Sequence, residues 1–296
     1  MNKTAVLQLI QDFSIETTPR GLSKLAPLAQ YLPAQTRVFI TFLPGAAFAD
    51  TVRSAQEIAA QGFTPVVHVA ARNLQSQAEL QEGLEALQAG GIRDLLLLAG
   101  GSIHTRSPFQ NALEILDSGI LEPFDWRSIG FAGHPEGHPD VQAEELRRAL
   151  EIKWQYARQY PREYYLATQF CFQAEPVIAW RQSLLAADIH FPLRLGVAGL
   201  ANTAALIRHA QLCGVGPSIN FLLTTAGVFR RLLGGVAAPG RLVADLAQAV
   251  QDGSIDEDVR LHFFPLGDFS RTTAWIAAIQ AGKFYLDNQQ GVHIEQ

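Results

Sequence analysis

The sequence predicts a single α/β domain over residues 1–296, a (β/α)₈ TIM barrel, because eight short apolar segments alternate with helical patterns. Most of these segments are continuous apolar runs, which are typical of parallel strands covered on both faces. The predicted strands begin at Phe13, Val38, Pro65, Asp94, Ser128, Tyr164, Arg194 and Leu261. An open doubly wound sheet is the alternative, but the number of units favours closure.

Amphipathic segments between these strands predict the surrounding helices. They run from Phe48 to Gln61, from Leu74 to Ala89 and from Val141 to Gln159, and glycines follow the first two. The stretch from Ala201 to Arg260 is longer than one βα unit needs. It predicts extra helices between strands 7 and 8 that pack on the barrel rather than form a second domain.

The composition argues against several classes of protein. Charged residues make up 17% of the chain and the formal net charge is −5, which argues against disorder and against nucleic-acid binding. The longest uncharged stretch contains polar residues and a proline, so no membrane span is expected, and the first residues lack the pattern of a signal peptide. Cys171 and Cys213 lie in apolar stretches and are expected to be buried free thiols, which suits a cytoplasmic protein.

Polar residues at the predicted carboxyl ends of the strands are the candidate site residues, because barrel enzymes have their active sites there. Glu16 interrupts the first strand near this end. A carboxyl group there loses solvation, which raises its pKa and suits it to general acid catalysis. A structural pair with Arg20 is the alternative.

The segment HPEGHPD, from His134 to Asp140, is the densest polar cluster. Its two histidines and glutamate are potential metal ligands with His68, but the prolines and the missing fourth ligand argue against a metal site. Contact with a substrate or cofactor is the favoured interpretation. A third possibility is a loop in which Asp140 caps the following helix.

Two further features suggest ligand contacts. The turn Gly100-Gly101-Ser102 lets backbone N–H groups approach an anion, although a plain tight turn explains it equally well. Gln169 places an amide in an apolar strand, where it matches the edge of an amide-containing heterocycle, and Phe170 beside it offers an aromatic wall. A core glutamine bonded to the backbone is the alternative.

Three of these segments resemble motifs of the methylenetetrahydrofolate reductase family, and the similarity extends from about Phe13 to Gly282. SIETTPR resembles the first-strand F-E-x-x-P motif, HPEGHPD resembles Y-P-E-x-H-P, and ATQFCF resembles T-Q-F-F-F. The resemblance implies a barrel that reduces 5,10-methylenetetrahydrofolate to 5-methyltetrahydrofolate. It implies that Glu16 donates a proton to N10 of the folate, and that Gln169 binds the pterin with Phe170 beside it. It implies flavin-side contacts from Thr41, His68, Ala132 and His138.

The chain also departs from the family pattern, as a short, divergent member would. Where the family has Arg-Gly-Asp after its fourth strand, this chain has Gly100, Gly101 and Ser102 after an alanine. His134 replaces a tyrosine, and Arg158 stands where the family has a lysine that contacts the flavin phosphates. Two cofactor versions remain open: one keeps FAD, with Arg158 and backbone amides holding its phosphates, and the other passes hydride directly from NAD(P)H to the folate. The loss of the two charges makes FAD doubtful and favours the second.

The resemblance therefore implies a cytoplasmic folate oxidoreductase, in either direction of the reaction. Its expected partner is a small-molecule folate, with no nucleic acid, membrane or metal, and a homo-oligomer is compatible with the sequence. Two other classes remain open on the same barrel. One is a folate- or corrinoid-linked methyltransferase, and the other is a non-catalytic folate-binding protein.

Overall fold

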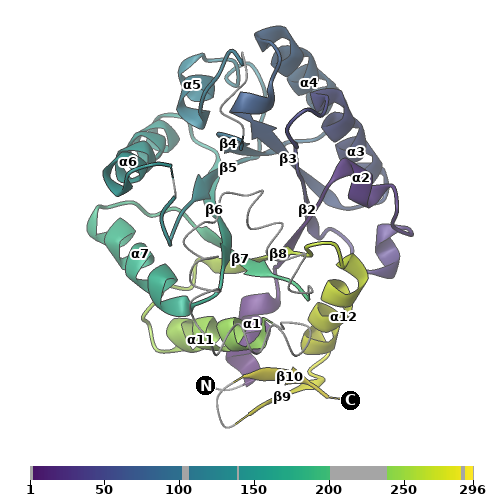
Figure 1. Cartoon of the computed structure of the whole chain (residues 1–296), viewed down its shortest axis with the longest axis vertical. Helices are drawn as coiled ribbons and strands as arrows, with labels where there is room; N and C mark the ends of the chain where they lie inside the picture. Colours follow the sequence, from purple (N-terminus) through teal and green to yellow (C-terminus); the bar gives the residue numbers. More distant parts are fainter. Residues whose placement is uncertain (1–2, 102–106, 139, 201–238, 288–290, 296) are drawn as a thin grey trace. The chain divides into compact units, whose positions relative to one another are not determined.

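Eight parallel strands form a closed barrel in the computed structural model, with neighbours in the order β1 to β8 (Figure 1). The structure describes residues 3–101, 107–138, 140–200, 239–287 and 291–295. The strands are β1 (Ser14–Thr17), β2 (Arg37–Ile40), β3 (Thr64–Ala70), β4 (Asp94–Leu98), β5 (Ser128–Gly133), β6 (Glu163–Cys171), β7 (Leu193–Ala198) and β8 (Val259–Phe264). Each begins within two residues of its predicted start, and the closed order excludes the open sheet.

Helices follow most of the strands, as the sequence predicts. The described helices are α1 (Lys3–Ile10), α2 (Pro19–Leu22), α3 (Phe48–Ala60), α4 (Gln77–Ala89), α5 (Ala112–Asp117), α6 (Ala143–Gln159), α7 (Ala174–Ala186), α11 (Gly240–Gln251) and α12 (Phe269–Gln280). Two short 3₁₀ turns, η1 (Leu28–Gln30) and η2 (Ala71–Asn73), and a hairpin of β9 (Phe284–Leu286) and β10 (Val292–Ile294) complete these elements. None of the described helices is long and apolar enough to cross a membrane.

Two predicted helix starts need correction. Helix α4 begins at Gln77 rather than Leu74, because Ser76 Oγ accepts a hydrogen bond from Glu79 N and ends the extended segment. Helix α6 begins at Ala143 rather than Val141, because Val141 still forms a β-bridge with His138. Of the region predicted to hold extra helices between β7 and β8, residues 201–238 lie outside the described part, and α11 follows them.

The chain forms two compact units. The β2–β4 unit comprises Ile15–Ala132 and Arg147–Ala167, and the β7–β8 unit comprises Met1–Ser14, Gly133–Leu146 and Thr168–Gln296.

The β2–β4 unit has an aromatic side chain in its core. Tyr165 packs with Phe39, Val66 and Leu96. Gly130 makes room for it, because a Cβ at Gly130 would lie 2.5 Å from the Tyr165 ring. In the β7–β8 unit, Leu193–Ala198 of β7 pairs in register with Val259–Phe264 of β8. There α1 contacts both α11 and α12.

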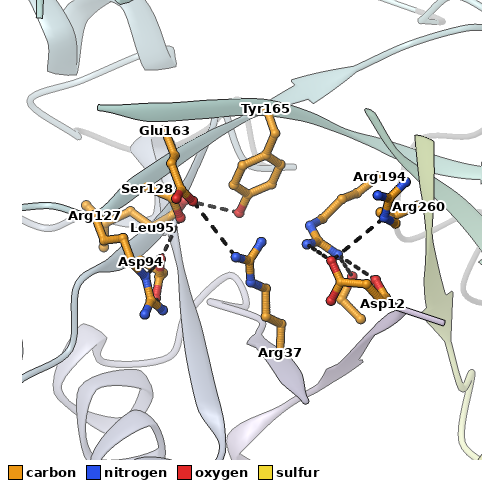
Figure 2. Close-up of polar contacts among 11 residues, drawn as sticks. Asp12, Arg37, Asp94, Leu95, Arg127, Ser128, Glu163, Tyr165, Arg194 and Arg260 are labelled. Atoms are coloured by element: carbon orange, nitrogen blue, oxygen red, sulfur yellow. Dashed lines mark hydrogen bonds and ion pairs between the residues drawn. The ribbon is translucent and has the colours of Figure 1, made fainter. Parts of the chain in front are cut away.

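Charged residues at the amino ends of the strands pair with one another, and Figure 2 shows these contacts. In the β2–β4 unit, Asp94 accepts hydrogen bonds from Ser128 Oγ at 2.6 Å and from Arg127 Nε at 3.0 Å. Arg37 lies 3.9 Å from a carboxylate oxygen of Glu163. Polar groups at this end of a barrel usually contribute to stability rather than to catalysis.

A second set of contacts occupies the amino ends of β7 and β8. In the β7–β8 unit, Arg194 Nη2 donates to the Asp12 carboxylate at 3.3 Å, and Arg260 Nε lies 3.9 Å from the same oxygen (Figure 2). Ser14 Oγ and His262 Nδ1 are 2.9 Å apart and both residues are buried. The buried groups, Ser14, His262 and Arg194, all have partners within the protein, so we assign them a structural role.

Candidate active site

Strands β1 and β3 bring an acid and a histidine together. Glu16 Oε2 lies 3.7 Å from His68 Nε2, and their side chains are 19% and 6% exposed. His68 also packs edge-on against Phe39, with ring centroids 5.9 Å apart. His68 is thus one partner of Glu16, whereas the alternative that the sequence left open was a structural pair with Arg20. Two titratable groups this close, one of them still reached by solvent, form a candidate site for acid–base chemistry.

The end of β1 is held by the residue that follows β2. The Thr41 backbone N–H donates to Thr17 O at 2.9 Å, and Thr41 Oγ1 donates to the same oxygen at 3.2 Å. Thr17 directly follows Glu16, so Thr41 restrains the strand end that carries the acid. This contact gives Thr41 a role besides the predicted cofactor contact.

The turn after β4 brings its backbone close to η2. Gly100 has a φ of +85°, and a Cβ there would lie 3.3 Å from both Ala70 Cβ and Asn73 Oδ1. Gly101 is exposed, and Ser102 lies outside the described residues. Only glycine adopts this φ without strain, so the sequence interpretation of a tight turn agrees with the structure.

Arg72 is a cation at this turn that the sequence reasoning missed. Its Nε donates to Gln110 O at 2.9 Å, its Nη1 to Gly100 O at 3.4 Å, and its backbone N–H to Ala99 O at 2.8 Å. The signal in the sequence that could have identified Arg72 is its position four residues after His68, just beyond the predicted third strand.

The predicted cation Arg158 does not reach this end of the strands. It is exposed in the last turn of α6, which leads into the amino end of β6. Ala132 lies near the carboxyl end of β5, as predicted. The buried cation of α6 is Lys153, whose Nζ lies 5.5 Å from the centre of the Phe131 ring. Burial lowers the pKa of Lys153 to about 8.

The β7–β8 unit contains the predicted histidine segment. The rings of His134 and His138 meet edge to face with centroids 5.4 Å apart. His138 Nδ1 accepts a hydrogen bond from Asp140 N at 3.1 Å, and α6 begins three residues after Asp140. Asp140 is therefore not the helix cap that the sequence allowed. Across the described residues, no group of three His, Cys, Asp or Glu side chains is placed to hold a metal ion.

Glu136, in the same segment, is a largely buried carboxyl group beside the end of β6. Burial raises its pKa, and a hydrogen bond from the Phe172 backbone N–H opposes this shift. Burial also raises the pKa of the Cys171 thiol nearby, and the Glu136 charge adds to that effect. Cys171 is a buried free thiol, as predicted, while Cys213 lies outside the described residues.

Gln169 and Phe170 follow one another near the carboxyl end of β6. The backbone carbonyl oxygen of Gln169 accepts hydrogen bonds from Thr168 Oγ1 at 2.8 Å and from Cys171 Sγ at 3.3 Å. Phe170 is buried against Phe172 and Phe264, with centroids 5.6 and 5.5 Å away. Because side chains alternate along a strand, Phe170 lies on the face opposite to Gln169. This placement favours a core role for Phe170 over the predicted folate contact.

Comparison with known proteins identifies the family. A family model of methylenetetrahydrofolate reductase matches residues 12–221. The chain is 24% identical over 207 residues to methylenetetrahydrofolate reductase 1 of Schizosaccharomyces pombe, covering 68% of this chain and 33% of that protein. It is 23% identical over 169 residues to methylenetetrahydrofolate reductase 2 of Saccharomyces cerevisiae, covering 55% and 27%. The chain spans about a third of the length of these curated relatives.

A solved structure of oxaloacetate acetylhydrolase covers 94% of this chain and 84% of its own, with 12% identity and a TM-score of 0.47. A likeness of that size carries no argument about function. The family model, by contrast, matches the sequence itself over residues 12–221, a range that includes Glu16, His68 and Gln169. The chain belongs to the methylenetetrahydrofolate reductase family.

Proposed function

We propose that this protein interconverts 5,10-methylenetetrahydrofolate and 5-methyltetrahydrofolate by hydride transfer from or to NAD(P)H. The observation that carries the proposal is the half-buried Glu16 carboxyl group 3.7 Å from His68 at the ends of β1 and β3. Family membership supports the substrate class. A cytoplasmic location is part of the proposal and is supported by the buried free thiol of Cys171.

Glu16 acts as the general acid. Its proton goes to N10 of the folate, the bond from N10 to the bridging carbon breaks, and a cation forms at N5 and that carbon. Hydride from the reduced nicotinamide then converts this carbon to the methyl group. His68 Nε2 lies 3.7 Å from the Glu16 carboxylate, a distance that allows a proton to pass between the two groups through one water molecule. The amide of Gln169 binds the pterin edge, offering one donor and one acceptor side.

We propose that the reaction does not require FAD. The turn after β4 has no charged residue at Ala99, Gly100 or Gly101, and Arg158 lies at the opposite end of its βα unit. Arg72 is at the turn, but its guanidinium already binds two backbone carbonyl oxygens. A diphosphate would have to compete with these bonds, so the described residues do not fit the phosphates of FAD well.

The test is an assay of the purified protein with 5,10-methylenetetrahydrofolate and either NADH or NADPH. We expect nicotinamide oxidation that depends on the folate, with 5-methyltetrahydrofolate as the product by mass spectrometry. A methyltransferase would instead consume 5-methyltetrahydrofolate without oxidising a nicotinamide. A non-catalytic protein would bind the folate and leave both compounds unchanged. Either result would refute the proposed reaction.

A further inference from the structure

A threonine hydroxyl links the carboxyl ends of β6 and β7 beside Gln169. Thr168 Oγ1 accepts a hydrogen bond from Gly196 N at 2.8 Å and donates one to Gln169 O at 2.8 Å. A hydroxyl has one proton to donate, so the Gln169 oxygen receives it while a lone pair serves Gly196. We propose that Thr168 is a positioning residue, which acts through Gly196 and the Gln169 backbone to orient the Gln169 amide toward folate.

The backbones of β6 and β7 lie very close together at Gly196. A Cβ on Gly196 would lie 2.5 Å from the Gln169 carbonyl carbon, closer still to its oxygen, and 2.7 Å from Phe170 N. These are main-chain atoms, which cannot rotate away as a flexible side chain would. The Gln169 peptide is therefore held between the bare Cα of Gly196 and the hydroxyl of Thr168.

Thr168 acts at a distance from any ligand that Gln169 binds. A Cβ at Gly133 would lie 3.4 Å from Thr168 Cγ2 and 2.7 Å from Trp180 on α7, so Thr168 faces the same side as this helix. Thr168 is 2% exposed. Since side chains alternate along the strand, Gln169 points to the other face. Thr168 is thus a positioning residue rather than a catalytic one, and its effect passes through the Gln169 peptide.

The decisive variant is Thr168→Val, which keeps the side-chain shape and removes the hydroxyl. We expect it to raise the KM for 5,10-methylenetetrahydrofolate about 10-fold, the loss expected for a hydrogen bond of ordinary strength, while kcat changes less than 3-fold. Thr168→Ser keeps the hydroxyl and should restore the KM. Thr51→Val is the matched control, because Thr51 is fully buried and its hydroxyl has no hydrogen-bond partner among the described residues.

The inference rests on the proposed function, so binding is measured alongside activity. Titration calorimetry with 5-methyltetrahydrofolate should show about 10-fold weaker binding for Thr168→Val than for the wild type and Thr51→Val. Wild-type protein that neither binds nor reduces folate would refute the proposed function. If the wild type binds folate and Thr168→Val binds it equally well, the positioning role of Thr168 is refuted while the proposed function stands. So would a fall in melting temperature with an unchanged KM, which is the result of a purely structural role.

A second variant covers the case in which Thr168→Val folds poorly because its methyl group crowds Gly196 N. Thr168→Ala removes the hydroxyl without placing a carbon at that position. We expect the same rise in KM, with Thr168→Ser again close to wild type. A KM for Thr168→Ala within 2-fold of wild type would overturn the inference.

Discussion

Replacing Glu16 by glutamine tests the proposed acid most directly. Glutamine has nearly the same shape as glutamate and still forms hydrogen bonds, so a side chain that is 19% exposed should keep its position. It cannot deliver the proton to N10. Loss of a general acid typically costs about 10²- to 10⁴-fold in rate, or about 2.7–5.5 kcal/mol in the activation barrier. We expect kcat to fall by that factor while the affinity for folate changes little.

The assay is the steady-state oxidation of NAD(P)H with saturating 5,10-methylenetetrahydrofolate. Folate affinity and melting temperature are measured on the same preparations. Glu57→Gln is the matched control, because Glu57 is exposed on α3 and the same substitution there should leave every quantity at its wild-type value. A kcat for Glu16→Gln within a few-fold of wild type would remove Glu16 from the mechanism. Equal losses in both variants would show that the effect is not local.

Three further outcomes follow from the structure. FAD should bind more weakly than about 1 μM and should not increase turnover, because an absent arginine contact typically costs about 1.5–3 kcal/mol; calorimetry and assays with added FAD measure this. Arg181→Met should lower the free energy of unfolding in urea by about 2–3 kcal/mol, because it leaves the partly exposed Asp256 without its buried partner at 2.6 Å. Arg241→Ala, which breaks an exposed pair, should change it by less than about 0.5 kcal/mol. Lys153→Met should stabilise the protein by up to about 3 kcal/mol at pH 7, because the folded pKa of about 8 lies below the ordinary 10.5 and the buried charge opposes folding there. Wild-type stability should then rise between pH 8 and 10.5, so the two unfolding curves should converge at the upper end of that range.

The sequence predicts the strands because most of them are continuous apolar runs. It does not predict the side-chain contacts between strands. His68 and Glu16 are both candidates from the sequence, yet nothing in the sequence pattern places the His68 Nε2 atom 3.7 Å from the Glu16 carboxylate. The start of α4 was missed because one capping hydroxyl, that of Ser76, outweighed the apolar residues before it. Arg158 is a candidate only through the family resemblance, although the helix predicted from Val141 to Gln159 already places it in a last turn, far from the carboxyl end of the preceding strand.

The two ends of the strands use polar residues in different ways. At the amino ends, charges pair with opposite charges, as Asp94 does with Arg127 and Asp12 does with Arg194. Losing one partner there leaves a charge in a poorly solvated place, which limits the changes that the fold tolerates.

At the carboxyl ends, side chains bind backbone oxygens instead, as Thr41 does at Thr17, Arg72 at Gly100 and Thr168 at Gln169. Such bonds hold the backbone at the strand ends in place, whether or not the side chains that face the ligand are charged. A member of this family can therefore exchange the charged residues of its β4 turn while it keeps Glu16 and Gln169 in place. We therefore expect the cofactor contacts to change more readily than Glu16, the proposed acid, and Gln169, the proposed folate ligand. This is why we expect folate chemistry to persist where FAD binding does not.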